Sequence, residues 1–243
     1  MQREKTIAGN TATGLLKLIA LGLMFVDHAG KMLCGNMLEM RLIGRMAFPL
    51  YCWCMVVGAS HTRSMPRYIL RVVLVGVLSQ PLYILALNHT WDEANIFLTL
   101  ALALVGLWGI REHRWLSQWW APAVALVLAV ATGCDYGWQG VLLVFLLYGV
   151  RDSRSGIAAV MVAFCLYWGS TSSPVSVLFG QTLQWQGALG KLIAPWMRIQ
   201  SLAILSLPLM LIRFPKDVHL PRWAGYALYP LHLAVLALLE YCL

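Results

Sequence analysis

The chain has 243 residues, of which 60% are hydrophobic and only 12% are charged, and its mean hydropathy is +0.72. Soluble domains carry about 25% charged residues, so this composition excludes an ordinary globular protein and indicates a polytopic membrane protein. The net charge of +8 comes from short Lys and Arg clusters between apolar runs. Such clusters orient a chain in a membrane, and we expect no nucleic-acid partner because no basic face large enough for a duplex is visible.

Apolar runs predict an all-α polytopic membrane protein, a bundle of about nine transmembrane helices (range about 8–10) around a central cavity. The first run, 15–33, follows a polar segment, 1–14. It contains internal charges and lacks a small-residue cleavage signal, so we expect a retained first span. We expect the whole chain, 1–243, to form one membrane domain. The later apolar runs cover residues 48–60, 68–87, 96–110, 119–132, 138–150, 157–169, 200–212 and 224–243.

The positive residues at the ends of these runs predict the orientation of the chain. In a nine-span arrangement one side carries most of them, and that side should be cytoplasmic, with the N-terminal segment inside and the C-terminus outside. The opposite side keeps five exceptions, Lys31, Arg41, Arg45, Lys191 and Arg198. The residues on the cytoplasmic side are Arg3, Lys5, Arg63, Arg67, Arg71, Arg111, Arg114, Arg151, Arg154, Arg213, Lys216 and Arg222.

The stretch 171–197 and the cysteines carry less information about function. The stretch 171–197 is rich in Ser, Gly, Gln and Trp and is predicted to be a long outer connection with a short re-entrant helix. The six cysteines form no C-x-x-C pair, and several lie inside apolar runs, where Cys behaves as a small hydrophobe. We therefore expect no metal site, although Cys34 and Cys134 fall near the same predicted membrane face and could pair.

Three ionisable residues, Lys17, Asp27 and His28, lie in the first apolar run. A charge at mid-bilayer costs about 2.5–3.5 kcal/mol on insertion scales, so such residues persist where they face a protein interior or a wet cavity. Lys17 and His28 are eleven positions apart, which places them within about 20° of one another around a helix and about 16 Å apart along it. Asp27 points some 100° away from His28 and is expected to serve a neighbouring helix.

Arginines form two further candidate groups. Arg41 and Arg45 share a helical face just before the second long apolar run and could hold anions. Arg63, Arg67 and Arg71 repeat every four residues, a spacing that would line three guanidinium groups on one face. Guanidinium groups bind phosphate oxygens through paired donors, so this row could grip a cytoplasmic nucleotide. The alternative is that the row only satisfies the positive-inside rule and contacts lipid headgroups.

Polar residues further along the chain each have a structural and a functional interpretation. Asn95 begins an apolar run and could cap its helix, and Asp135, followed by Tyr136, could interact with the dipole of the next one. His232 follows Pro230 inside the last run. Proline frees a backbone carbonyl that a buried imidazole could satisfy, but intramembrane histidines are also often functional.

These motifs, in this order, resemble the TraX family, whose members are described as pilin N-terminal acetylases of conjugation systems, within the wider superfamily of transmembrane acyltransferases that includes the acyltransferase 3 enzymes. In the acyltransferase 3 relatives a basic residue precedes the essential His by eleven positions, and Lys17 and His28 match that spacing. The resemblance covers almost the whole chain apart from 171–197. The residues that carry it are Lys17 to His28 (KLIALGLMFVDH), Ile43 to Pro49 (IGRMAFP), Asn95 to Phe97, Asp135 to Gly137 and Tyr229 to His232.

The resemblance implies transfer of an acetyl group from cytoplasmic acetyl-CoA to an acceptor on the outer side of a bacterial inner membrane. The acceptor would be a pilin-like N-terminus, another peptide, a glycan or a small amine. His28 would be the general base, with a transient acetyl-His as an alternative, and Arg45 or Asn95 would stabilise the oxyanion while Asp27 pairs with Arg45 or another basic neighbour.

Other residues would bind the two substrates. Lys17, Arg63, Arg67 and Arg71 would bind the donor, and Arg41, Asp135, Tyr136 and His232 would line the acceptor side. Membrane lipids are further expected partners. Two other classes of function stay open at this point: a proton-coupled transporter that uses Asp27, His28 and His232, and a scaffold subunit of a membrane assembly.

Overall fold

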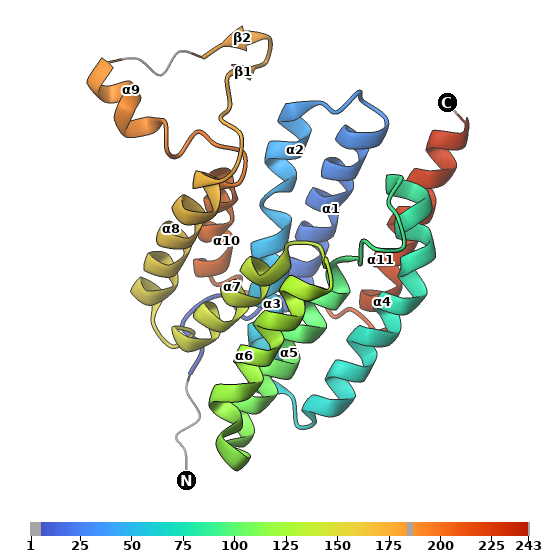
Figure 1. Cartoon of the computed structure of the whole chain (residues 1–243), viewed down its shortest axis with the longest axis vertical. Helices are drawn as coiled ribbons and strands as arrows, with labels where there is room; N and C mark the ends of the chain where they lie inside the picture. Colours follow the sequence, from blue (N-terminus) through green and yellow to red (C-terminus); the bar gives the residue numbers. More distant parts are fainter. Residues whose placement is uncertain (1–5, 184–186, 243) are drawn as a thin grey trace. The chain divides into compact units, whose positions relative to one another are not determined.

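The computed structural model describes residues 6–183 and 187–242, without the side chains of 222–224. Two residues of the predicted cytoplasmic set, Arg3 and Lys5, lie outside the described residues, as does the side chain of Arg222. The described chain is helical apart from one two-stranded hairpin (Figure 1), which confirms the predicted helical class. It divides into two compact units, Met1–Tyr51 with Val150–Val218 and Cys52–Gly149 with His219–Leu243, each of which is described by itself. The expectation of one domain stays a prediction.

The first unit contains α1 (Thr13–Met32), α2 (Leu38–Gly44), the first turn of α3 (Ala47–His61), α8 (Arg154–Ser170), α9 (Gly187–Ile193), the 3₁₀-helix η2 (Ser201–Ser206) and α10 (Leu207–Leu211). Helix α1 packs against α2, and α8 packs against η2 and α10. The N-terminus of α1 is capped by a residue that is far away in the sequence. Asp217 accepts hydrogen bonds from the amides of Gly14 (3.3 Å) and Leu15 (3.0 Å). A carboxylate at this end also interacts favourably with the helix dipole.

The described part of the connection 171–197 contains more secondary structure than the short helix that was predicted there. It contains the antiparallel strands β1 (Val177–Leu178) and β2 (Gln181–Thr182) before α9. Arg198 ties its end to α8 by donating to the carbonyl of Gly169 (2.6 Å) and to that of Ser172. These carbonyls at the end of a helix need donors, which gives a structural reason for an arginine that the sequence analysis counted among the exceptions to the positive-inside rule. The prediction of a short helix in this stretch is confirmed, its re-entrant character stays a prediction, and the hairpin was missed.

The second unit contains the rest of α3, α4 (Met65–Leu87), α5 (Ile96–Glu112), the 3₁₀-helix η1 (Arg114–Leu116), α6 (Ser117–Ala131), α7 (Gly137–Gly149) and α11 (Arg222–Cys242). Helix α5 lies at its centre and packs against α4, α6 and α7, while α11 packs against α4. Gly109 lets α5 approach α6 closely, since a side-chain carbon at that position would lie 2.3 Å from the Cβ atom of Ala121. Small residues at such contacts are typical of membrane helices.

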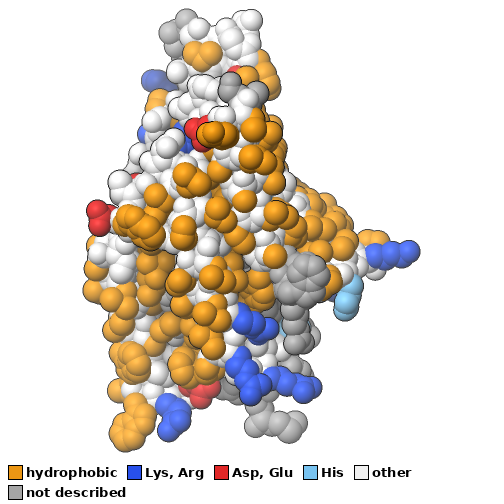
Figure 2. All heavy atoms as spheres, turned by 90° about the vertical axis from the view of Figure 1, so that its right-hand side faces the viewer, with side chains coloured by type: hydrophobic (Ala, Val, Ile, Leu, Met, Phe, Trp, Pro, Cys, Tyr) orange, Lys and Arg blue, Asp and Glu red, His pale blue; other side chains and the backbone are white. Residues whose placement is uncertain are grey.

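Four helical segments in the described chain are long and apolar enough to cross a bilayer: Thr13–Met32, Leu38–His61, Met65–Leu87 and Gly225–Cys242. Hydrophobic side chains cover most of the face on which α4 and α11 lie (Figure 2). The structure therefore fits a membrane protein. The predicted nine spans are not confirmed, because α5, α6, α7 and α8 have only 13 to 17 residues each, fewer than the roughly 20 that a perpendicular crossing needs.

Candidate functional site

The first unit contains an ion pair between Asp27 and Arg45. Asp27 is on α1 and is only 8% exposed. Arg45 directly follows α2, and its terminal guanidinium nitrogen donates to Asp27 Oδ2. The Nε atom of Arg41, one turn earlier, lies 3.9 Å from Asp27 Oδ1. The expected pairing of Asp27 with Arg45 is confirmed, and one carboxylate faces two guanidinium groups, so this cluster has a formal charge of +1.

A glycine makes this pairing possible. A side-chain carbon at Gly44 would lie 2.2 Å from the Cβ atom of Asp27, so only glycine allows the end of α2 to approach α1 this closely. The next residue, Arg45, is then placed beside the carboxylate, and its Nε atom donates back to the carbonyl of Arg41 at 3.3 Å. The guanidinium group is thus oriented by two bonds, which fixes where its charge lies.

His28 and Lys17 both lie on α1 and both are half-buried. Because α1 is an uninterrupted helix from Thr13 to Met32, the eleven-residue spacing places them on one face, as expected. His28 lies next to Asp27 in the chain but points to a different side of the helix. The first unit therefore brings together the ion pair of Asp27 and Arg45, the nearby Arg41, and a half-buried imidazole on the adjacent face of α1.

The prediction that Arg63, Arg67 and Arg71 share one helical face is wrong for Arg63. Helix α4 begins at Met65 with Pro66 in its first turn, so Arg63 lies before the helix. Proline favours the first helical turn because it lacks an N–H and its φ angle is fixed, and this sets the start of the helix. Arg67 and Arg71 remain one turn apart on α4, where Arg71 donates to the carbonyl of Arg67 (3.1 Å) and lies 5.9 Å from the ring centre of Tyr68.

Arg111 is a residue whose role the sequence analysis missed. Its guanidinium group reaches from the end of α5 to the carbonyls of Ala59, at the end of α3, and of Thr62 (3.3 Å), just after it. Arg111 therefore closes the C-terminus of α3 and holds it beside the end of α5. This contact agrees with the expectation that Arg63 and Arg111 lie on one side of the membrane.

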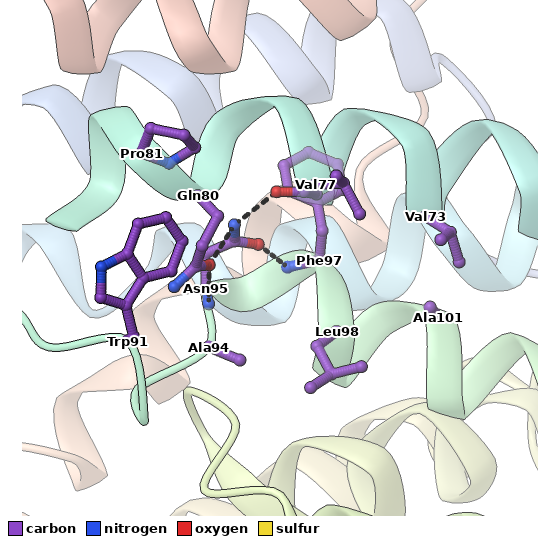
Figure 3. A pocket seen from close by; sticks show the side chains of 11 residues that line it. Val73, Val77, Gln80, Pro81, Trp91, Ala94, Asn95, Phe97, Leu98 and Ala101 are labelled. Carbon is purple, nitrogen blue, oxygen red and sulfur yellow. Dashed lines mark hydrogen bonds between the residues drawn. The ribbon is translucent and has the colours of Figure 1, made fainter.

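Asn95 joins α4 to α5 (Figure 3). Its Oδ1 atom accepts from the amide of Phe97 (3.0 Å), which confirms the predicted helix cap. Its Nδ2 atom donates to the carbonyl of Gly76 and to Oε1 of Gln80, both at 2.8 Å. Both amide hydrogens are thus engaged, which favours a structural role over oxyanion stabilisation. Gln80 was not singled out from the sequence, because an isolated Gln in an apolar run carries no motif.

We expect Asn95→Ala to lower the thermal stability of the protein more than Ser153→Ala does. Ser153 caps α8 by accepting from the amide of Gly156 (3.0 Å), and its hydroxyl also lies 3.0 Å from that of Ser155 in the same helical turn. Loss of such a cap costs about 0.5–2 kcal/mol, and Asn95→Ala also removes the bonds from Nδ2 to the Gly76 carbonyl and to Oε1 of Gln80. Thermal unfolding of both variants in detergent tests this. Equal melting temperatures would contradict the linking role of Asn95.

The residues of the second unit that were predicted for the acceptor side, Asp135, Tyr136 and His232, lie around the same helix start as Asn95. The amide of Asp135 donates to the carbonyl of Ala94 (3.0 Å), and Thr99 on α5 donates to the carbonyl of Asp135. Tyr136 adopts a left-handed conformation (φ 63°) in the same turn. His232 on α11 is buried, and its ring packs edge-on against Tyr229, whose ring packs against Phe97 at 4.7 Å. This unit thus gathers Asn95, Asp135, Tyr136 and His232 around the start of α5.

The loop between α4 and α5 contains a carboxylate whose pKa is shifted. The pKa of Glu93 is lowered, first because the amide of Thr90 donates to its carboxylate (3.0 Å) and second because His89 Nδ1 lies 2.9 Å from the same oxygen. A lowered folded-state pKa means that these bonds stabilise the loop above the ordinary pKa of Glu93 and are lost as the pH falls through the lowered value.

We therefore expect the protection of the Thr90 amide against hydrogen exchange to be constant at neutral pH and to fall under acidic conditions. The expected midpoint lies below the ordinary pKa of a glutamate, and Glu93→Gln should remove the dependence on pH. Protection factors measured between acidic and neutral pH test this. A midpoint in the range of a free histidine would assign the effect to His89 instead.

All six cysteines lie within the described residues and are free thiols, so the pair considered for Cys34 and Cys134 is not formed. Among the described side chains there is no group of three or more His, Cys, Asp or Glu residues that could hold a metal ion.

The fold and the charged cluster define a helical membrane protein with a buried carboxylate–guanidinium pair in its first helices. The chain belongs to the TraX family, since the family model described as TraX protein matches residues 12–240. This family assignment agrees with the resemblance found in the sequence motifs.

Two curated relatives are informative. A probable fimbrial assembly protein FimC, serogroup H1, of Dichelobacter nodosus is 27% identical over 238 residues, which cover 91% of this chain and 92% of the relative. Protein TraX of Escherichia coli K12 is 29% identical over 156 residues, which cover 63% of this chain and 61% of that protein. A search of the solved structures found no significant match.

Proposed function

We propose that the chain is a membrane-embedded acetyltransferase that transfers an acetyl group from acetyl-CoA to an acceptor amine or hydroxyl, in the first place the N-terminus of a pilin-like protein. Membership of the TraX family and the likeness to a fimbrial assembly protein support a pilin-related function. The observation that carries the chemistry is the half-buried His28 on α1, next to the Asp27–Arg45 ion pair. Charges placed at membrane depth cost free energy, and proteins keep them there mainly for function.

In the proposed reaction the acceptor nitrogen or oxygen attacks the thioester carbon while His28 takes its proton. The carbonyl oxygen becomes negatively charged in the tetrahedral intermediate, and the guanidinium group of Arg45 stabilises that charge. The carbon–sulfur bond then breaks, and the imidazolium returns the proton to the CoA thiolate. One imidazole serves first as base and then as acid, which is a common role of histidine in proton transfer.

Asp27 has a supporting role in this scheme. Its carboxylate neutralises Arg45 in the resting state and orients the guanidinium group, because an unpaired charge at this depth would be costly. The second guanidinium group, that of Arg41, leaves an excess positive charge beside the pair. We propose that Arg41 binds the acceptor or stabilises the developing oxyanion. Asn95, in contrast, is proposed to stabilise its own unit.

For the donor we propose that Arg67 and Arg71, with Arg63 from the preceding loop, bind the phosphates of acetyl-CoA on the cytoplasmic side, with Lys17 also facing the donor. Guanidinium groups suit phosphates because they stay charged and offer paired donors. Asp135, Tyr136 and His232 remain proposed acceptor-side residues. The proposed location is a bacterial inner membrane with the N-terminus in the cytoplasm, as the distribution of arginines favours.

Purified protein in proteoliposomes should release free CoA from acetyl-CoA only when an acceptor is present, and mass spectrometry should find the acetyl group on that acceptor. Suitable acceptors are a peptide with a pilin-type N-terminus, the same peptide with a blocked amine, a glycan and a small amine. Acetylation of the free but not the blocked peptide is the expected result. Proton-driven solute flux without CoA release would contradict the proposal and support a transporter.

A further inference from the structure

A pocket of about 490 Å³ lies between α4 and α5 in the second unit (Figure 3). This volume lies within the range of about 300–1,000 Å³ that is typical of small-molecule sites. The pocket extends along α4 from Val73 to Gln80, a distance of about 10 Å at the usual rise of a helix. Its walls are apolar along this length, with Leu98 and Ala101 of α5 opposite Val73 and Val77 of α4.

The polar residues at one end of the pocket are already bound to each other. Gln80 accepts from Asn95 (2.8 Å) and donates to the carbonyl of Glu93 (2.7 Å), while the second hydrogen of Asn95 Nδ2 binds the Gly76 carbonyl. A polar ligand would have to break these bonds, and leaving a buried partner unpaired costs about 1–3 kcal/mol. An apolar ligand needs no such exchange, so the site favours a hydrocarbon group.

The position of the pocket indicates where this group comes from. Helix α4 is one of the candidate membrane spans, and only 28% of its apolar window is buried. Val77 lines the pocket and is 65% exposed, and its neighbours Leu74 and Leu78 are exposed as well. The pocket is therefore continuous with an exposed apolar face of α4, which would contact hydrocarbon if α4 crosses a bilayer. Trp91, which is 74% exposed, lies at the polar end, where indoles are usual at a membrane interface.

We propose that this pocket binds one acyl chain of a bilayer phospholipid, with the end of the chain between Val73 and Ala101 and the headgroup side near Trp91. Burial of the chain replaces bilayer contacts by contacts with α4 and α5, so binding depends on shape and packing. The lipid would fill the space between the two helices that Asn95 and Gln80 link. The proposal does not depend on the acetyltransferase activity.

The test uses the full chain in nanodiscs of phosphatidylethanolamine and phosphatidylglycerol that contain a phospholipid with a diazirine at the end of one acyl chain. After irradiation, peptide mass spectrometry maps the adducts. We expect them to be concentrated on the segments around Val73 to Val77 and Leu98 to Ala101. Adducts spread evenly over the exposed apolar faces, including that of α6, would show annular lipid only and would overturn the proposal.

Matched variants test the pocket itself. Val77→Trp places an indole at the mouth and should reduce labelling of these segments about tenfold, which corresponds to about 1.4 kcal/mol of binding free energy. Leu78→Trp is the control, since Leu78 is 72% exposed on the same turn but does not line the pocket. Equal labelling in the two variants would contradict the site. A second experiment uses a free fatty acid that carries the same diazirine. If the fatty acid labels these segments and the phospholipid does not, the assignment to a phospholipid is overturned.

Discussion

Arg45→Ala is expected to destabilise the protein by about 3–5 kcal/mol, because it removes the hydrogen-bonded partner of a buried carboxylate and leaves only the longer contact with Arg41. Asp27 is only 8% exposed, and Arg45 is its hydrogen-bonded partner. The carboxylate would then lack its closest hydrogen-bond donor inside the packed helices, which costs free energy. The free energy of unfolding in detergent, compared with that of the wild type, measures this loss.

Arg41→Ala is the matched control for this prediction. Its Nε atom lies 3.9 Å from Asp27, and its side chain is 32% exposed against 11% for that of Arg45. A more exposed and longer ion pair contributes about 0–1 kcal/mol, so Arg41→Ala should have a small effect. The double variant Asp27→Asn with Arg45→Gln should recover much of the lost stability, since it removes both charges. Equal losses for Arg45→Ala and Arg41→Ala would contradict the pairing seen in the structure.

His28→Ala is expected to reduce acetyl transfer by about 10²–10⁴-fold, the usual contribution of a general base. The loss should fall on kcat, with KM for acetyl-CoA changing little, because the proposed role of His28 is in the proton transfer. The residue is half-buried, and its replacement by a smaller side chain should leave the protein folded. Acceptor-dependent CoA release by the purified variant, with its melting temperature measured in parallel, tests this prediction.

His61→Ala serves as the control of the same residue type. His61 lies at the exposed end of α3, where its Nδ1 atom lies 2.9 Å from the carbonyl of Val57. We expect its replacement to leave the rate of transfer unchanged. Normal turnover by His28→Ala would remove the general-base assignment, whereas loss of solute flux in the same variant would support the transporter alternative.

The apolar runs were sufficient to predict α1 and α3 to α8, because burial in a membrane demands long hydrophobic segments. They were not sufficient for α2, which has Glu39 and Arg41 within seven residues, or for the hairpin of β1 and β2. Segment 200–212 was predicted as a span, but it divides into η2 and α10, with Pro208 at the start of the latter. Short elements like these depend on tertiary contacts that local sequence does not contain.

The candidate site, like the fold, could be predicted from the sequence only in part. A basic partner for Asp27, either Arg45 or another basic neighbour, could be expected from the sequence because charges are rare in apolar runs and each needs a partner. The network of Gln80 with Asn95 and the contact of Arg111 with α3 could not, since they depend on which helices become neighbours. The predicted row of arginines wrongly included Arg63, because helical spacing was assumed before Met65, where the helix begins.

A density map of the protein with acetyl-CoA bound tests the central claim most directly. The account predicts that the thioester carbonyl lies beside His28, with its oxygen toward Arg45 and room for an acceptor atom at about 3–3.5 Å from the carbonyl carbon. A thioester bound away from α1, with the imidazole of His28 facing lipid, would contradict the proposed function.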